Sequence, residues 1–129
     1  MSVQPQYAAM PTIGLVQATS ANTNRDGTGT IATLLTARAP GTRVERIMAK
    51  AAGTTTAGML RIYLKLASGD TWRLLAEIAV SAVTPSASLA AWSGEWAPTN
   101  GLSLADGNML GVSTHNAETF NVFAVGAHL

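Results

Sequence analysis

The 129-residue chain contains no cysteine, so neither a disulfide framework nor a thiolate metal site is possible. Charged side chains are also scarce, since they make up 12% of the residues where an average domain has roughly 25%. No stretch approaches the roughly 18 apolar residues that a membrane-spanning helix needs, and the N-terminus lacks the basic region of a secretion signal. These absences predict a soluble protein whose fold is held by packing alone.

The charge balance is close to neutral, with eight basic residues, seven acidic residues and a net charge of +1. A charge this small gives little attraction for a phosphate backbone, which argues against nucleic acid as a direct partner. Sparse charge also lowers the barrier to self-association, so we expect a homo-oligomer. The length is typical of one domain with one core.

Alternation of apolar and polar residues is clearest over residues 59–80 and predicts a β-hairpin. One face carries an apolar set consisting of Leu60, Ile62, Leu64, Leu66, Trp72, Leu74, Ala76, Ile78 and Val80. For this set to share a face, the loop must have an odd length, such as residues 68–70. That register assigns Trp72 to the core. Its outward pairs are Arg61 with Glu77, Tyr63 with Leu75, and Lys65 with Arg73.

Shorter segments predict further strands at about residues 12–19, 29–37, 42–50, 108–114 and 118–127. Turn sequences such as NRDG and ADGN separate them. Seven or eight short antiparallel strands are typical of an all-β sandwich or jelly roll. We therefore predict one β-sandwich domain over residues 12–129, preceded by an extended N-terminal arm over residues 1–11. Residues 81–98 are predicted to form a long connection with one helical turn after Ser86.

No group of side chains points to catalysis or to a bound cofactor. His115 and His128 are the only histidines, and neither has potential metal ligands at a recognised spacing. The segment GVSTH lacks the final glycine of a nucleophile elbow, and Asp26 is the single acid in NRDGTGT, which is too few for calcium. The sequence thus predicts a protein that is not an enzyme. His115 is expected to lie in a hairpin turn in which Asn116 adopts a positive φ angle.

Apolar side chains outside the predicted core are candidates for contacts between proteins. Met59, Tyr63 and Leu75 fall on the outer face of the predicted hairpin, where they suit packing against a second copy in a dimer or trimer. Trp92 and Trp96 fall in the long connection, and we expect them to pack across the end of the sandwich. Anchoring of a protein partner and stacking on a sugar are the alternatives for these two tryptophans.

Four segments resemble the small β-rich virion proteins encoded among the structural genes of tailed bacteriophages and prophages: NTNRDGTGTIATLLTA, GTTTAGMLRIYL, WRLLAEIAVSAVTPS and LADGNMLGVSTHNAETFNVFAVGAHL. The resemblance covers roughly residues 20–129. It includes no catalytic motif and supplies no site to carry over residue by residue. Proteins of this kind are commonly capsid decoration, or cement, proteins, and others belong to tails or baseplates.

The resemblance implies a structural role in a virion, most simply as a cement protein that binds between subunits of the major capsid protein. Many weak contacts with a repeating lattice suit a protein with little charge, a flat β surface and a reaching arm. The expected partners are further copies of the chain and the major capsid protein, and Tyr7 and Met10 in the arm would contact one or the other. The expected location is the capsid surface, after synthesis in the bacterial host cytoplasm. A tail or baseplate module and a carbohydrate-binding receptor module are the alternatives.

Overall fold

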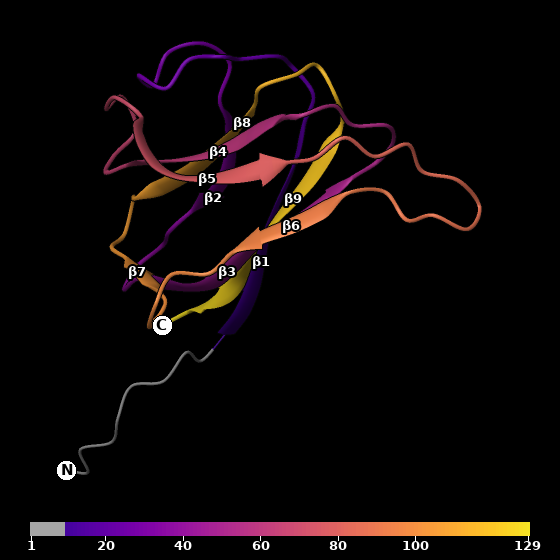
Figure 1. The fold of residues 1–129 in the computed structure, drawn as a ribbon. Helices are drawn as coiled ribbons and strands as arrows, with labels where there is room; N and C mark the ends of the chain where they lie inside the picture. The colour runs from indigo at the N-terminus through magenta and orange to yellow at the C-terminus, as the bar shows by residue number, and fades with distance from the viewer. Residues whose placement is uncertain (1–9) are drawn as a thin grey trace, which may run out of the picture.

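A computed structural model of the chain describes residues 10–129 and contains nine β-strands in two antiparallel sheets. The strands are β1 (Met10–Ala18), β2 (Ala32–Thr36), β3 (Thr42–Ala51), β4 (Gly58–Lys65), β5 (Arg73–Val80), β6 (Ser93–Trp96), β7 (Leu102–Leu104), β8 (Met109–Thr114) and β9 (Phe120–His128), as drawn in Figure 1. No helix occurs among the described residues. The predicted all-β sandwich of about eight strands is confirmed, whereas the jelly-roll order stays a prediction.

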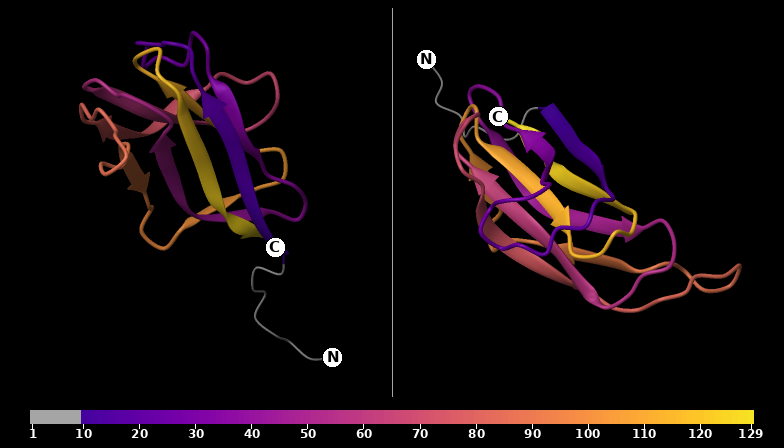
Figure 2. Two further views of the ribbon diagram at one scale, coloured as in Figure 1. Left: turned by 90° about the vertical axis from the view of Figure 1, so that its right-hand side faces the viewer. Right: turned by 90° about the horizontal axis from the view of Figure 1, so that it is seen from above.

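The two sheets, which we call sheet A and sheet B, lie face to face (Figure 2). Sheet A has the strand order β1-β9-β3-β6, with β7 also paired to β3. Sheet B has the order β2-β8-β4-β5. The last strand, β9, lies between β1 and β3, so that the two ends of the described chain are joined in one sheet.

The core lies between the sheets and is built from side chains of both. Its most deeply buried apolar members are Val44, Ile47, Leu60, Ile62, Leu110, Val112, Phe120, Val122 and Ala124. Because side chains alternate along a strand, inward residues occupy every second position of β4 and β8. The residues between them point away from the core, and these form the outer face of sheet B.

Several element boundaries differ from the sequence prediction. The strand β1 begins at Met10, so Met10 and Pro11 belong to the first strand, while residues 1–9 with Tyr7 lie outside the described residues. Strands β6 and β7 form where only connections were predicted, because strands of four and three residues are too short to show a periodicity. Both pair with β3.

The connection between β5 and β6 projects from the sandwich, as Figure 1 shows. The predicted helical turn after Ser86 is wrong. Ser86 and Leu89 instead exchange two backbone hydrogen bonds, at 3.0 and 3.3 Å, that close a tight turn. Val83 and Thr55 exchange backbone hydrogen bonds in the same way at 2.9 and 3.2 Å, which ties the base of the connection to the segment between β3 and β4.

The hairpin of β4 and β5 contains a β-bulge that the sequence did not indicate. Arg61 lies opposite Glu77, as predicted, but the register shifts after Ile62 so that Tyr63 lies opposite Leu74 and not opposite Leu75. Leu75 is the extra residue of the bulge, and the predicted pairs beyond it are wrong.

A bulge reverses the faces of the residues on one side of it relative to those on the other, and this moves Trp72, which lies on the loop side of Leu75. Trp72 is not in the core, contrary to the prediction. Its ring lies under the ammonium group of Lys65, with Nζ 4.4 Å from the ring centroid, and against the backbone of Gly111 on the outer face of sheet B. The cation–π contact explains how two residues assigned to opposite faces come to share one.

Candidate interaction surfaces

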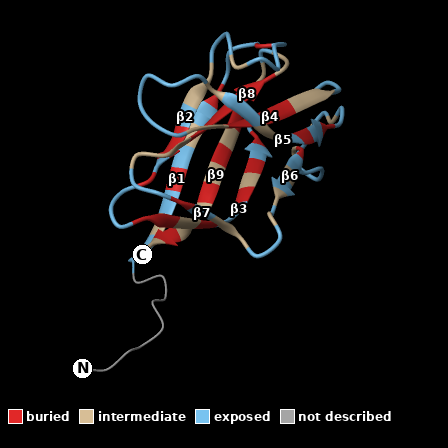
Figure 3. Cartoon of the chain, turned by 90° about the vertical axis from the view of Figure 1, so that its left-hand side faces the viewer, coloured by how far each residue is buried: buried red, intermediate tan, exposed pale blue. Residues whose placement is uncertain are grey.

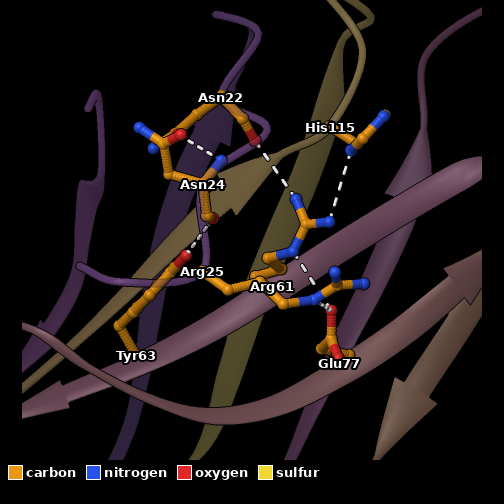
Figure 4. A network of polar contacts seen from close by, with 7 residues as sticks. All are labelled: Asn22, Asn24, Arg25, Arg61, Tyr63, Glu77 and His115. Carbon is orange, nitrogen blue, oxygen red and sulfur yellow. Dashed lines mark hydrogen bonds and ion pairs between the residues drawn. The ribbon is translucent and has the colours of Figure 1, made fainter. Parts of the chain in front are cut away.

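The outer face of sheet B is covered by residues 19–31 of the same chain (Figure 4). Arg61 and Tyr63 point outward from β4, yet both are fully buried. The Tyr63 hydroxyl donates to the backbone carbonyl of Asn24 at 2.8 Å, and Arg61 Nη1 donates to the backbone carbonyl of Asn22 at 3.2 Å. These bonds hold the covering segment against the sheet.

Hydrogen bonds within residues 19–31, which we call the covering loop, fix its shape. Asn22 Nδ2 donates to the carbonyl oxygens of Thr28 and Thr30 at 2.9 and 3.0 Å, and Asn22 Oδ1 accepts from the backbone of Asn24. The hydroxyl and backbone N–H of Thr28 donate to Asp26, and this bonding holds the pKa of Asp26 below its ordinary value. The sequence predicted only a tight turn here.

The charge of Arg61 is balanced by Glu77 on the neighbouring strand. Arg61 Nε donates to Glu77 Oε2 at 3.1 Å, and Arg25 from the covering loop donates to the same oxygen at 2.8 Å. The bond from Arg25, followed by the bond from Arg61, lowers the pKa of Glu77 below its ordinary value, although burial acts in the opposite direction. One carboxylate therefore joins β4, β5 and the loop.

His115 also contacts this network, with Nδ1 3.3 Å from Arg61 Nη2. Because a guanidinium group has only donors, Nδ1 must accept, which places the ring proton on Nε2. The neighbouring Ser113 is buried, and its hydroxyl has no hydrogen-bond partner among the described residues.

The predicted positive φ angle at Asn116 is wrong, because among the described non-glycine residues it is Asn100 that adopts one.

The predicted interface on the outer face of the hairpin does not exist as an exposed patch. Tyr63 is fully buried beneath the covering loop, so the prediction that it faces solvent or a second copy is wrong. Met59 is half-buried, and Leu75 is half-buried against the core because it is the bulged residue. The physical reason is intramolecular, since the chain covers this face with its own loop.

The remaining predicted interface residues are dispersed. Trp92 is 8% exposed and packs edge to face on Phe120, with ring centroids 5.7 Å apart. Trp96 is half-buried against the core, so both tryptophans take the packing role expected of them. Met10 is exposed at the start of β1, and Tyr7 lies outside the described residues.

The outer face of sheet A carries exposed apolar residues that the sequence reasoning missed. Ile13 and Leu15 on β1 are 64% and 61% exposed, and Figure 3 shows exposed and buried residues alternating along this strand. Their cross-strand partners on β9 are Val125 and Phe123, and Phe123 in turn lies opposite Met48 on β3. We call these five residues the sheet A patch. A shallow hollow of about 360 Å³ lies beside this patch, between β3 and β6, and is lined in part by Phe123 and Met48 and otherwise by residues such as Lys50, Ser93 and Glu95.

The sheet A patch was difficult to recognise because both faces of β1 are apolar. The inward residues of β1 include Gly14, Val16 and Ala18, whereas the larger Ile13 and Leu15 point outward. From the size and hydrophobicity of the side chains alone, Ile13 and Leu15 would be predicted to face the core. Gly14 faces β2 so closely that a side chain there would collide with the backbone of Leu34, so this inward position admits only a glycine.

Residues 10–129 contain no cluster of three or more His, Cys, Asp or Glu side chains placed to hold a metal ion. Over the same range, no helix has the length and apolar character needed to cross a membrane.

Comparison of the chain with protein-family models, with curated proteins and with solved structures gives no match.

Proposed function

We propose that the protein is a structural component of a tailed-phage virion, most simply a decoration protein that binds between major capsid subunits at the capsid surface. The role is mechanical, and no residue is assigned to catalysis. The proposal rests on the resemblance of four segments to small virion proteins. One feature of the fold supports it further, namely the projecting connection between β5 and β6.

The projecting connection, which we define as residues 81–92, has the character of an insertion into a protein interface. It contains no charged residue, and residues 86–90 at its end are all exposed, including Leu89. Connections of this length in compact domains usually serve a function. An uncharged tip with one large apolar side chain suits a crevice between protein subunits better than it suits a nucleic acid or a sugar.

Binding of this kind stabilises a shell by mass action. A protein that binds the assembled lattice but not its free subunits shifts the equilibrium toward assembly. When the free protein is at 100 times its dissociation constant, each occupied site contributes about 2.7 kcal/mol. Many weak sites on a repeating shell therefore add up, although none of them needs a deep pocket.

A tail or baseplate module is the alternative within the same class, because it would use the same fold and the same apolar surfaces. The carbohydrate-binding alternative loses its support, since Trp92 is buried against Phe120 and Trp96 packs against the core. A sugar-stacking platform needs an exposed aromatic face.

Image reconstruction of particles from the strain that encodes the chain tests the proposal directly. We expect density for the domain at repeated positions on the head. Density confined to the tail would select the alternative, and absence from purified particles would refute both.

An attachment assay tests the role of the projecting connection. Particles lacking the protein are incubated with the wild-type chain, with Leu89→Ser and with the matched control Leu66→Ser. Leu66 is also exposed but lies on the β4–β5 loop. We expect only Leu89→Ser to reduce attachment.

A further inference from the structure

The two histidines of the chain have hydrogen-bond partners of different character. His115 Nδ1 lies 3.3 Å from Arg61 Nη2, and His128 Nδ1 lies 2.7 Å from the hydroxyl oxygen of Thr42. A hydroxyl group can donate or accept, so Thr42 can keep its bond when Nδ1 of His128 gains a proton. A guanidinium group can only donate, so the bond from Arg61 exists only while Nδ1 of His115 carries no proton.

Arg61 depends on this acceptor because it is buried beneath the covering loop. It is 1% exposed, and its guanidinium group donates to Glu77 on β5, to the Asn22 carbonyl of the loop and to His115, which follows β8 (Figure 4). A proton on Nδ1 of His115 would set a second cation and a second donor against this group. Whether the ring or the guanidinium group then moves away, a buried cation loses one of its acceptors, and this cost weakens the closed arrangement of the loop.

The other charged groups near His115 leave this repulsion uncompensated. His115 forms no ion pair with a carboxylate within residues 10–129. The carboxylates on the surrounding elements already accept hydrogen bonds from other residues. Besides Arg61, the charged groups on these elements are Glu77 of β5, Arg25 and Asp26 of the covering loop, and Glu118 of the turn that contains His115.

We infer that His115 is a proton sensor that releases the covering loop when the pH falls. The closed loop requires an uncharged ring, whereas the open loop leaves the ring free to bind a proton, so protons favour the open state. The closed state is therefore most stable above about pH 7.5 and is weakened as the pH falls through the range in which histidine becomes charged. Release exposes Arg61 and Tyr63, which the loop buries completely. The inference does not rest on the proposed function.

Hydrogen exchange of the purified chain at pH 7.5 and pH 5.5 tests the inference. The amide of Asn22 donates to the carbonyl oxygen of Thr114 at 2.8 Å, so its protection reports on the closed loop. Protection is expressed relative to an unstructured peptide at the same pH, which removes the intrinsic effect of pH on exchange. We expect the protection of Asn22 to fall by up to about tenfold at pH 5.5, because a histidine ring in water is then about nine-tenths charged. Equal protection at both pH values would overturn the inference.

Two substitutions assign the effect to one ring. His115→Asn places an amide oxygen where Nδ1 lies, and this oxygen can accept from Arg61 without binding a proton, so protection of the loop should no longer depend on pH. The matched control His128→Asn should respond to pH like the wild type, and circular dichroism verifies that both variants are folded. A loop that still opens with acid in His115→Asn, or that no longer does so in His128→Asn, would refute the role of His115.

Glu77 does not account for a change over this pH range. Arg25, followed by Arg61, holds the pKa of Glu77 below its ordinary value of 4.5, so its carboxylate is charged at both pH values. The pH range of the experiment thus separates the two titratable partners of Arg61.

The protonation of the ring can also be observed directly. Nitrogen-15 NMR of the histidine side chains distinguishes a proton on Nδ1 from one on Nε2. At pH 7.5 we expect the ring of His115 to carry its proton on Nε2, because Nδ1 accepts from Arg61. A proton on Nδ1 at this pH would show that the bond from Arg61 is not formed, and the inference would be wrong.

Discussion

Tyr63 is a residue whose face was predicted correctly from the sequence but whose burial was not. Its position in the alternating pattern of β4 places it on the outer face, and this part of the prediction is correct. The covering loop then buries it, through a hydrogen bond to Asn24 that joins residues 39 positions apart. The alternation of apolar and polar residues along β4 cannot predict a contact with a residue so distant in the sequence.

The Tyr63 hydroxyl gives a prediction that isolates the docking of the covering loop. Tyr63→Phe removes one buried hydrogen bond and should lower the free energy of unfolding by about 1 kcal/mol. Chemical denaturation measures this change. Hydrogen exchange should accelerate at the amides of residues 22–30 and remain unchanged in β9. Equal exchange in the loop of both proteins would show that this bond does not hold it.

Glu77 makes stability depend on pH in acid. Its pKa is lowered in the folded state by Arg25 and Arg61, so the unfolded chain binds a proton more readily. The stabilisation is present above the ordinary value of 4.5 and is lost as the pH falls through the lowered pKa. We expect Glu77→Gln to cost about 1 kcal/mol at neutral pH, and the difference from wild type to narrow below about pH 4.

Urea unfolding at a series of pH values measures the effect of Glu77→Gln. Asp106→Asn is the control, because Asp106 is exposed and forms no ion pair within the described part of the chain. The control should differ from wild type by a similar amount at every pH. A constant difference for Glu77→Gln as well would contradict the role assigned to the carboxylate.

Irregularities within elements decide which residues share a face. The bulge at Leu75 transfers Trp72 from the predicted core to the outer face, and a second register shift lies between Val44 and Arg46 of β3. Near this second shift, Gly126 of β9 lies so close to β3 that a side chain would collide with the backbone of Arg43. The close approach of β9 to β3 therefore requires a glycine at position 126.

Replacement of Gly126 tests the close approach of β3 and β9. Gly126→Ala should lower the free energy of unfolding by about 2 kcal/mol or more, because the colliding atoms belong to the backbone and cannot rotate away. Gly53→Ala is the matched control, since nothing lies within 4 Å of the added methyl group, and its effect should stay within about 0.5 kcal/mol. Thermal unfolding distinguishes the two, and equal melting temperatures would refute the steric argument.

At the scale of the whole molecule, the sandwich described by residues 10–129 has its core between the sheets. The first of its strands begins at Met10. Residues 1–9 lie outside the described residues, and the attachment role expected of Tyr7 in this segment stays a prediction.

Deletion of residues 1–9 tests this prediction. The free energy of unfolding should change by less than about 0.5 kcal/mol, because all the strands found in residues 10–129 are retained. Attachment to particles that lack the protein should weaken, as measured by co-sedimentation. Full attachment of the shortened chain would show that the N-terminal residues are not an attachment arm, whereas a large loss of stability would show that they belong to the fold.

The sequence by itself determined the fold class, the position of seven of the nine strands and the pairing of Arg61 with Glu77, because alternation along a strand and turn chemistry are local properties. Only the tertiary structure decided which outer face is covered. The bonds that close sheet B join residues far apart in the chain, as Asn24 and Tyr63 do. On sheet A, β1 is apolar on both faces, and only its packing in the structure, with Gly14 close against β2, shows which face is inward. A pattern of period two can name the two faces of a strand, but it cannot say what will lie against each of them.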